Sequence, residues 1–370
     1  MSPAQASRPT RVGLVVEQCW QRVPGGSATY IAELTQALLE RSDIDPVGLS
    51  ALHLRDRPTS VGLSLPVRAL PLPRAALYRL WDHTGVPRPE WTVHGLDVVH
   101  ATTWAVPATR LPLVVTVHDL AFLRDPTHFT PHGVRFFTRA LNRTRDLAQA
   151  VIVPSVATAL DCEQAGIEPE RIHVIPHGAR QPVVRDAPEH LLTLPDRYVL
   201  WCGTWEPRKN VSALLAAFEL VAAEDKDIHL VLVGPRGWGE RVAPEASSPS
   251  ADRVHLLGRL DTAQLDEAYA RAAAFCFPST WEGFGLPVLE AMAAGLPVVT
   301  SRDTSMAEIA AGVGVLVDPR DPADIAAGIV RAIGPEHPTL AALSRKRALD
   351  YTWAAAAQRT TAAYEAALHG

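Results

Sequence analysis

Short apolar runs alternate with helical stretches along the whole chain, and this alternation constrains the fold more than any other feature. In the first half the predicted strands are Val12–Val16, Asp97–His100, Leu113–His118, Ala150–Pro154 and Ile172–Pro176. In the second half they are Tyr198–Cys202, Ile228–Val233, Val254–Leu257, Ala274–Phe277, Pro297–Thr300 and Gly314–Val317. Apolar strands that alternate with helices are typical of parallel sheets covered by helices. The sequence therefore predicts an α/β protein with doubly wound layers.

Two such series in one chain predict two domains. A chain of 370 residues exceeds one ordinary core, and a polar, proline-containing stretch separates the two series. We expect an N-terminal domain over 1–180, a linker over 181–195, a second domain over 196–338 and a long helix over 339–370. The other predicted helices are Ser27–Arg41, Asn210–Ala223, Thr262–Ala272 and Pro287–Ala294.

Composition excludes several classes of protein. No run of about 18 apolar residues that could span a bilayer is present. The polar, Pro/Ala-rich first ten residues lack the apolar stretch of a signal peptide, so we expect a cytoplasmic protein. A net charge of −5 argues against nucleic-acid binding. The four cysteines are far apart, which predicts structural burial and neither disulfides nor a zinc site.

The segment from Thr280 to Glu290 carries the strongest chemical signal, because it joins a predicted strand to a predicted helix. Gly283 and Gly285 form a tight turn at the helix start, where backbone N–H groups and the helix dipole suit a diphosphate. Glu282 and Glu290 flank this turn, and carboxylates accept hydrogen bonds from sugar hydroxyls. A plain helix start with a capping acid is the structural alternative.

The segment from Gly203 to Asn210 follows another predicted strand and also opens a helix. Its Arg208 and Lys209 could neutralise the charge that develops on a leaving diphosphate. Lysine is rare in this chain, with three among 35 basic residues. A solvated helix start is the alternative for this segment.

The segment from Pro278 to Gly295 resembles glycosyltransferase family 4, whose members are retaining enzymes with the GT-B fold. The matching motif is Pro278-Ser279-x-x-Glu282-Gly-Phe-Gly-Leu-Pro-x-x-Glu290-Ala-Met-Ala-x-Gly295. Glu282 and Glu290 match the family's pair of glutamates separated by seven residues. The resemblance covers nearly the whole chain, most tightly from Ile172 to Pro319. It implies two Rossmann-like domains that face each other across a cleft. It also implies that the last helix crosses back to the first domain, with Tyr351 and Trp353 at the junction.

The resemblance assigns roles residue by residue. Glu282 would contact hydroxyls of the transferred sugar, and Glu290 would hold the ribose. Backbone groups that would contact sugar and phosphate belong to Gly283, Phe284, Gly285 and Leu286. The family commonly places a basic residue directly after the glycine that corresponds to Gly203. Thr204 stands there in this chain, so the charge falls on Arg208 and Lys209.

In the first half, Gly25 and Gly26 resemble the family's glycine loop over the diphosphate, although an ordinary loop is the alternative. His118 occupies the place of a histidine near the donor sugar, and Asp119 could orient its imidazole. Base recognition would fall to residues that follow strands of the second domain: Arg236, Arg259 and Leu260. The two arginines could equally be solvated surface residues.

The activity implied is retaining transfer of a hexose from a nucleoside diphosphate sugar, and GDP-mannose is the donor we expect. A glycan, a lipid-linked sugar and a small molecule remain open as acceptors, and the oligomeric state stays open. A non-catalytic nucleotide-sugar-binding subunit and a GT-B epimerase or phosphorylase are the alternatives. We expect no cofactor and no metal, and we interpret the Asp-x-Asp patterns at 43–45 and 225–227 as solvated loops. The basic amphipathic segments 74–83 and 128–147 fit either half-buried helices or weak contact with the inner membrane face.

Overall fold

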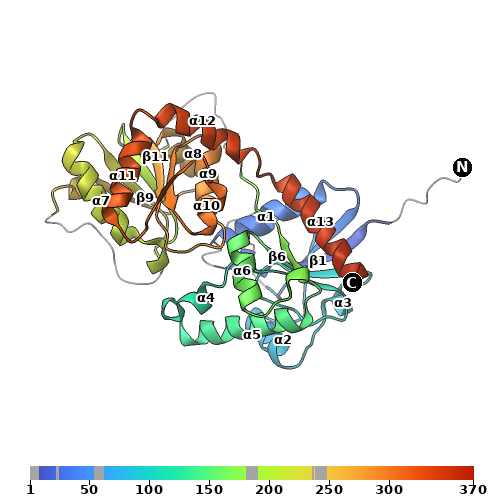
Figure 1. The fold of residues 1–370 in the computed structure, drawn as a ribbon. Coiled ribbons are helices and arrows are strands. Elements are labelled where there is room, and N and C mark those ends of the chain that lie inside the picture. Colours follow the sequence, from blue (N-terminus) through green and yellow to red (C-terminus); the bar gives the residue numbers. More distant parts are fainter. Residues whose placement is uncertain (1–7, 22–24, 54–61, 181–190, 236, 238–247) are drawn as a thin grey trace, which may run out of the picture. The chain divides into compact units, whose positions relative to one another are not determined.

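The computed structural model describes residues 8–21, 25–53, 62–180, 191–235, 237 and 248–370. The chain divides into two compact units, each with its own core. Unit 1 comprises Met1–Gly178 together with Thr352–Gly370, and unit 2 comprises Ala179–Tyr351. Figure 1 shows helices packed around a sheet in each of them.

Within its described residues, the sheet of unit 1 has seven parallel strands in the order β3-β2-β1-β4-β5-β6-β7. The strands are β1 (Thr10–Val15), β2 (Ile44–Ser50), β3 (Val67–Ala69), β4 (Val98–Ala101), β5 (Leu113–Thr116), β6 (Ala150–Val153) and β7 (Ile172–Val174). Because β1 pairs with both β2 and β4, the strand order reverses beside β1. Ligands of open α/β sheets bind outside the carboxyl ends of the strands at such a point.

The helices of unit 1 have buried inner faces. They are α1 (Gly25–Leu39), α2 (Arg74–His83), α3 (Pro89–Thr92), α4 (Ala121–Arg124), α5 (Pro131–Leu147), α6 (Val156–Gln164) and α13 (Trp353–His369), with 3-10 turns η1 (Glu17–Trp20), η2 (Pro126–His128) and η3 (Pro169–Arg171). The two basic amphipathic segments correspond to α2 and to η2 with α5. Leu77 and Trp81 of α2 and Leu141 of α5 are buried, so apolar residues of both segments lie in the core of unit 1.

The predicted single helix over 339–370 is wrong. The structure contains α12 (His337–Ala348) in unit 2 and α13 in unit 1. Thr352 has an extended backbone, and its side chain accepts a hydrogen bond from the amide of Ala355, so it begins a new helix as an N-cap. The new helix α13 packs on α1 and on β4, β5 and β6.

Within its described residues, the sheet of unit 2 has six parallel strands in the order β10-β9-β8-β11-β12-β13. The strands are β8 (Tyr198–Cys202), β9 (His229–Val233), β10 (Val254–Gly258), β11 (Ala274–Phe277), β12 (Val298–Ser301) and β13 (Val315–Val317). The helices are α7 (Val211–Glu224), α8 (Thr262–Arg271), α9 (Leu286–Ala293), α10 (Ser305–Ile309), α11 (Pro322–Ile333) and α12, with turns η4 (Pro207–Lys209) and η5 (Ala251–Arg253).

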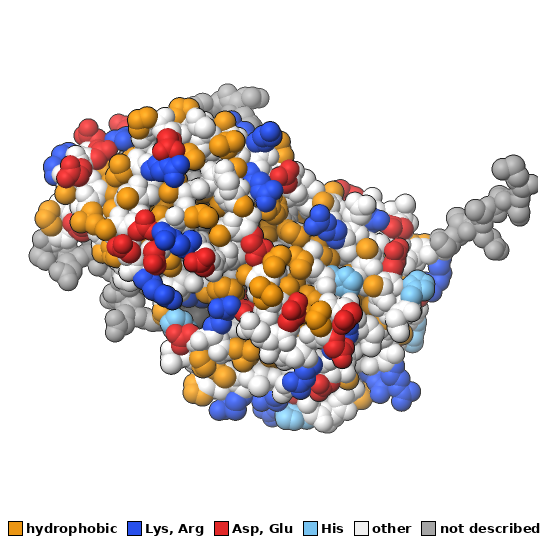
Figure 2. All heavy atoms as spheres, in the orientation of Figure 1, with side chains coloured by type: hydrophobic (Ala, Val, Ile, Leu, Met, Phe, Trp, Pro, Cys, Tyr) orange, Lys and Arg blue, Asp and Glu red, His pale blue; other side chains and the backbone are white. Residues whose placement is uncertain are grey.

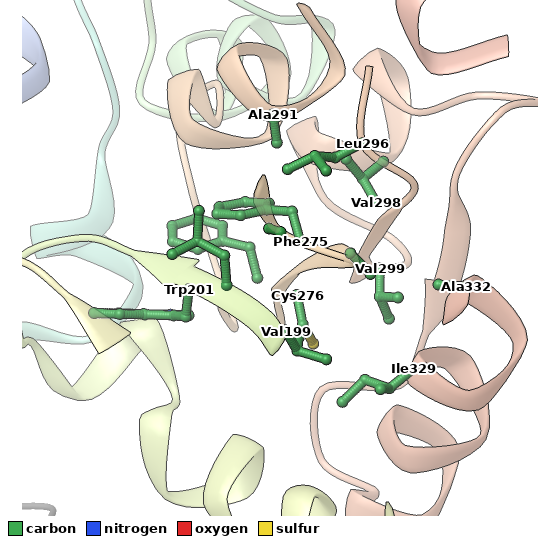
Figure 3. Packing of buried hydrophobic residues seen from close by; sticks show 14 of the residues in the cluster. Val199, Trp201, Phe275, Cys276, Ala291, Leu296, Val298, Val299, Ile329 and Ala332 are labelled. Atoms are coloured by element: carbon green, nitrogen blue, oxygen red, sulfur yellow. The ribbon is translucent and has the colours of Figure 1, made fainter. Parts of the chain in front are cut away.

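The core of unit 2 lies between its strands and the covering helices. Figure 3 shows strand residues of β8, β11 and β12 packed with residues of α9, α11 and the turn after α9. The labelled members are Val199, Trp201, Phe275, Cys276, Ala291, Leu296, Val298, Val299, Ile329 and Ala332. This packing fixes the directions of β8 and β11, whose carboxyl ends carry the candidate site.

The strands β2 and β3 were not among the predicted strands. The strand β2 has the sequence Ile-Asp-Pro-Val-Gly-Leu-Ser, in which Pro46 and Gly48 are residues usually found in turns. Consequently the Asp43–Asp45 pattern is not wholly a loop, because Ile44 and Asp45 belong to β2 and Asp45 pairs with Arg11. The second pattern does lie in a connection, where Asp225 pairs with Arg197.

Other expectations from composition can be compared with the structure. Cys19, Cys162 and Cys276 are buried, whereas Cys202 at the end of β8 is only half-buried, and all four are free. Among the residues that the structure describes, no helix is both long and apolar enough to cross a membrane. On the face shown in Figure 2, basic side chains are interspersed with acidic ones, so that face carries no broad basic patch.

Candidate active site

The loops after β8 and β11 bring three predicted site residues together in unit 2. These two strands are neighbours in the sheet, so their carboxyl ends lie side by side. The Lys209 Nζ donates to Glu282 Oε1 at 2.5 Å, and the Arg208 Nη1 donates to Glu282 Oε2 at 2.7 Å. The Arg208 Nε also donates to Glu206 Oε2 at 2.9 Å. Two cations and two carboxylates thus form one compact, charge-balanced cluster.

Burial and charge act in opposite directions on this cluster. Burial alone would raise the pKa of Glu282, but the neighbouring charges of Arg208 and Lys209 outweigh it and hold that pKa below its ordinary value. Burial and the charge of Arg208 lower the pKa of Lys209, against the opposing pull of Glu282. Because Lys209 and Glu282 are both buried, each ion depends on the other for the charge contact that water cannot supply.

Asn210 ties the surrounding loops together. It adopts the left-handed conformation at φ 57°, which asparagine tolerates better than most residues. Its side-chain amide donates to the carbonyls of Pro278 at 3.0 Å and Pro319 at 2.6 Å. The loops after β8, β11 and β13 are therefore linked through one side chain, which keeps Arg208 and Lys209 at fixed positions.

Ser305 and Met306 of α10 contact the turn between β11 and α9. Gly285 has φ 107°, and a Cβ at this position would lie 2.6 Å from Met306 Cγ. The Ser305 Oγ donates to the carbonyls of Glu282 at 2.7 Å and Phe284 at 3.1 Å. Leu286 is the first residue of α9, so the turn presents its backbone at the positive end of a helix.

Glu290 lies one turn inside α9 and is half-buried. The Tyr269 Oη of α8 donates to Glu290 Oε2 at 3.2 Å. Burial, together with the charge of Glu290, raises the pKa of Tyr269 well above its ordinary value, so this phenol stays a hydrogen-bond donor. The carboxylate of Glu290 is thus held in place by a neighbouring helix.

The loops after β8 and β9 pack backbone against backbone. Gly234 has φ 141°, and a Cβ there would lie 1.8 Å from the Gly203 carbonyl oxygen. Thr204 is half-buried beside them, and a Cβ on Gly237 would meet its methyl group at 2.8 Å. Of the three residues predicted to meet a base, Leu260 packs on the core, Arg259 is exposed and Arg236 lies outside the described residues.

In unit 1, His118 follows β5 and is oriented by a carbonyl group. Its Nε2 lies 3.0 Å from the Thr102 oxygen, so Nε2 carries the hydrogen and Nδ1 is left as the basic nitrogen. The expectation that Asp119 orients this ring is wrong, because the Asp119 carboxylate caps the amide of Ala121 instead. Burial lowers the pKa of His118, although Thr102 and Asp119 oppose this shift.

Aromatic rings surround His118. Tyr30 of α1 meets it edge-on at 4.8 Å between centroids, and His177 lies 5.6 Å away. Gly25 and Gly26 are exposed and form the first turn of α1, where the sequence predicted a separate loop. Gly25 has φ 63°, a conformation that suits glycine where the chain enters the helix.

Two family models match this chain. "Glycosyltransferase Family 4" matches residues 24–180, and "Glycosyl transferases group 1" matches residues 196–334. Together they cover both units and include every predicted site residue. This protein is a family 4-like group 1 glycosyltransferase.

The curated relatives of this glycosyltransferase include named mannosyltransferases. The O-antigen chain mannosyltransferase B of Escherichia coli is 28% identical over 281 residues, which cover 72% of this chain and 74% of that protein. The MMP α-(1→4)-mannosyltransferase of Mycolicibacterium hassiacum is 26% identical over 405 residues, covering 93% and 95%. These relatives match the glycosyltransferase over most of their length.

Solved structures share the fold. Anabaena HepE in complex with UDP and glucose aligns with a TM-score of 0.70 at 20% identity, covering 96% of this chain and 98% of that one. Two Rossmann-like units with parallel sheets, together with this likeness, give the glycosyltransferase a GT-B fold.

The residues that sequence reasoning missed are those that support the site of the glycosyltransferase. Glu206, Tyr269 and Ser305 contact the predicted site residues Arg208, Glu290 and Glu282, and Asn210 links the loops that carry the site. Glu206 and Asn210 belong to the quoted segment Gly203–Asn210, so a search for partners of Arg208 could have found them. Tyr269 and Ser305 lie on separate helices, and nothing in their local sequence signals the contact.

The predicted absence of a metal remains a prediction. Within the described part of the chain, no group of three or more His, Cys, Asp or Glu side chains is arranged to hold a metal ion. Both Asp-x-Asp patterns lie away from the Glu282 cluster in sequence, and Asp45 and Asp225 are paired with arginines.

Proposed function

We propose that this enzyme transfers a hexose, with retention of anomeric configuration, from a nucleoside diphosphate sugar bound to unit 2. The observation that carries the proposal is the convergence of Arg208 and Lys209 on Glu282 beside the start of α9. Cations and a helix N-terminus are the groups that bind a diphosphate, and a carboxylate between them suits a sugar.

The charge-balanced cluster suggests how the donor would be received. Glu206 and Glu282 neutralise Arg208 and Lys209 in the structure. A donor diphosphate would bring oxygens that compete for the same two cations. Stabilisation of the leaving diphosphate by preorganised cations is the main contribution that such a site makes to the reaction rate.

Glu290 is the residue that we assign to the ribose. Its carboxylate stands one helical turn behind the phosphate-binding turn and is held by Tyr269. A carboxylate can accept from both vicinal hydroxyls of a ribose. Glu282 and Glu290 then bind opposite ends of one donor and do not form an acid/base pair.

Retention would follow from the donor's own phosphate assisting the acceptor, as the family resemblance implies. Glu282 is engaged by two cations and is better suited to bind a sugar hydroxyl than to attack carbon. Charge on the diphosphate is met by Arg208, Lys209 and the α9 dipole, so the proposal requires no divalent metal. We assign the acceptor side to unit 1, and we assign contact with the transferred sugar to His118, because the family resemblance implies both roles.

GDP-mannose is the donor that we propose, because the two curated relatives described above are named mannosyltransferases. The structural neighbour HepE was solved with UDP and glucose, which makes UDP-glucose the natural competitor. The acceptor class stays open among a glycan, a lipid-linked sugar and a small molecule.

A thermal-shift panel of GDP-mannose, UDP-glucose and a dTDP-sugar tests the donor. Binding to the folded state raises the melting temperature by mass action, so the true donor should give the largest rise. We expect GDP-mannose to give that rise and the Glu290→Ala variant to lose it. A larger rise with UDP-glucose would replace the proposed donor, and no rise with any member would contradict donor binding.

Two further measurements separate the alternatives. Slow release of nucleoside diphosphate without an acceptor is expected from the enzyme, whereas a non-catalytic binding subunit would release none. A phosphorylase would carry pyridoxal phosphate, so a flat visible absorption spectrum is expected here and an absorbing cofactor would favour the phosphorylase.

A further inference from the structure

A cluster of Glu17, Trp20 and His53 lies in unit 1 and has no part in the site described above. The Glu17 carboxylate is 1% exposed and accepts a hydrogen bond from the amide of Ala51 at 2.8 Å. It also contacts His53 Nε2 at 3.0 and 3.1 Å. The His53 ring stacks on Trp20, with centroids 5.0 Å apart and planes 8° from parallel.

This cluster stands at the carboxyl edge of the sheet. Glu17 and Trp20 belong to η1, which follows β1, and His53 lies three residues beyond the end of β2. Strands β1 and β2 are paired, so both segments leave the same edge. That edge is where open α/β sheets bind ligands, and β1 is the strand at which the order reverses.

The fold beneath the cluster is apolar. Val15, Ala51 and Leu77 are buried in one hydrophobic cluster there, and Tyr78 packs against it. The charge of Glu17 contributes, after burial, to raising the pKa of Tyr78, so the phenol lies within its field and stays protonated. An apolar floor with a few fixed polar groups is the usual make-up of a small-molecule site.

The hydrogen bonds fix the chemistry that His53 presents. A carboxylate only accepts, so Nε2 must carry the hydrogen and Glu17 holds the ring in one orientation. The remaining ring atom able to hydrogen-bond is Nδ1, and the side chain of His53 is 16% exposed. A buried carboxylate that faces an aromatic pair disfavours phosphate and nucleotide ligands by like charge, and it tolerates neutral ones.

We propose that Trp20 and His53 form a subsite for a neutral pyranose ring of the acceptor, with Glu17 as the residue that positions His53. The C–H face of a pyranose would lie on the stacked rings, and a sugar hydroxyl would bond to His53 Nδ1. This assignment rests on the proposed function, since it names the acceptor class of the same enzyme: a neutral hexopyranoside.

Saturation-transfer NMR on the full chain tests the subsite with methyl α-D-mannopyranoside and methyl α-D-glucopyranoside as probes. GDP is added at saturation to fill the nucleotide part of the donor site, and the comparison with Trp20→Ala separates the subsite from the hexose part of that site. Wild type is expected to transfer saturation to at least one probe, and Trp20→Ala is expected to weaken binding roughly fivefold or more. Trp91→Ala is the matched control, because Trp91 is 55% exposed on α3 of the same unit and should leave binding unchanged.

The role of Glu17 needs its own comparison. Glu17→Gln should weaken probe binding with GDP affinity unchanged, and His53→Gln, which keeps a donor and an acceptor, should bind better than His53→Ala. The subsite proposal would be overturned if wild type showed saturation transfer to neither probe. It would also be overturned if Trp20→Ala bound the probes as well as wild type does, at an unchanged melting temperature. GDP binding is measured on the same samples: its absence in every protein contradicts the proposed function alone, while probe binding still decides the subsite.

Discussion

At the scale of single residues, Glu282 is the residue on which the donor site depends. Its carboxylate receives Lys209 on one oxygen and Arg208 on the other, and a serine from α10 holds its carbonyl. The sequence indicated Arg208, Lys209 and Glu282 as candidates, because each follows a predicted strand. It could not show that they pair with one another, since Lys209 and Glu282 lie 73 positions apart in the sequence.

Lys209→Ala is expected to lower turnover by roughly 100-fold or more, because it removes a preorganised cation from the leaving diphosphate. Arg208 still neutralises Glu282 in the variant, so the fold should persist. Lys226→Ala is the matched control, because Lys226 is an exposed lysine of the same unit. Nucleoside diphosphate release from GDP-mannose measures both. Equal rates in Lys209→Ala and wild type would contradict the assignment of Lys209.

Gly285→Ala should destabilise unit 2 and weaken donor binding. The residue has φ 107° and a new Cβ would lie 2.6 Å from Met306 Cγ, so both strain and a clash arise. We expect a loss of about 1–3 kcal/mol in the free energy of unfolding. Gly312→Ala is the control, since Gly312 also has positive φ but has nothing within 4 Å of its Cβ position. Urea titration should show the larger loss for Gly285→Ala, and equal losses would mean that the Met306 contact is unimportant.

At the scale of elements, apolar patterning located most strands, including the edge strands β7, β10 and β13, but it missed β2 and β3. The bounds predicted for Tyr198–Cys202 and Ala274–Phe277 agree with β8 and β11, which are interior strands with nearly complete burial. The strand β2 was missed because Pro46 and Gly48 resemble a turn, and β3 is an edge strand of three residues. A buried parallel strand tolerates proline and glycine when the neighbouring strands and helices supply the packing. This packing cannot be read from the local sequence.

A buried chain of hydrogen bonds joins α13 to the sheet of unit 1. The Tyr364 hydroxyl lies 2.8 Å from His100 Nδ1, and His100 Nε2 lies 2.8 Å from Thr116 Oγ1. The chain ends at Tyr30, whose hydroxyl is 2.9 Å from the same threonine oxygen. Burial, with a smaller contribution from His118, lowers the pKa of His100 to about 3.

This histidine predicts how stability depends on pH. Folded His100 stays neutral, whereas the unfolded chain takes up a proton below its ordinary pKa of 6.5, so stability falls as pH drops from there towards about 3. The loss amounts to at most about 1.4 kcal/mol per pH unit. Urea titrations at about pH 7 and pH 5 should show a smaller loss in His100→Gln than in wild type. An equal loss in the two proteins would contradict a neutral buried His100.

At the scale of the whole molecule, the chain passes between the two units twice. The amide of Ala179 donates to the carbonyl of Tyr351 at 3.0 Å within unit 2. Within unit 1, Trp353 stacks on His177 at 5.8 Å, and a Cβ on Gly178 would lie 2.3 Å from the Trp353 amide nitrogen. The sequence located this crossing only through the family resemblance, because no periodicity marks it.

Two separate cores predict two separable unfolding transitions. Trp353→Ala removes a ring that is 9% exposed in unit 1 and should destabilise that unit by about 3–5 kcal/mol. Binding of GDP should raise the transition temperature of unit 2 by mass action. Differential scanning calorimetry of the variant with and without GDP measures both effects. A single transition that moves as a whole in response to both changes would contradict independent cores.

The central claim is that unit 2 binds a nucleoside diphosphate between Lys209 and Glu290. Calorimetric titration of GDP and UDP tests this claim in wild type, in Glu290→Ala and in the control Glu224→Ala. Glu224 is an exposed glutamate at the end of α7. Loss of the ribose contact should weaken binding about tenfold or more, as expected for a charge-assisted hydrogen bond. The account predicts saturable binding in wild type and Glu224→Ala and the weaker binding in Glu290→Ala. Equal affinity in all three proteins, or no heat of binding in wild type, would contradict it.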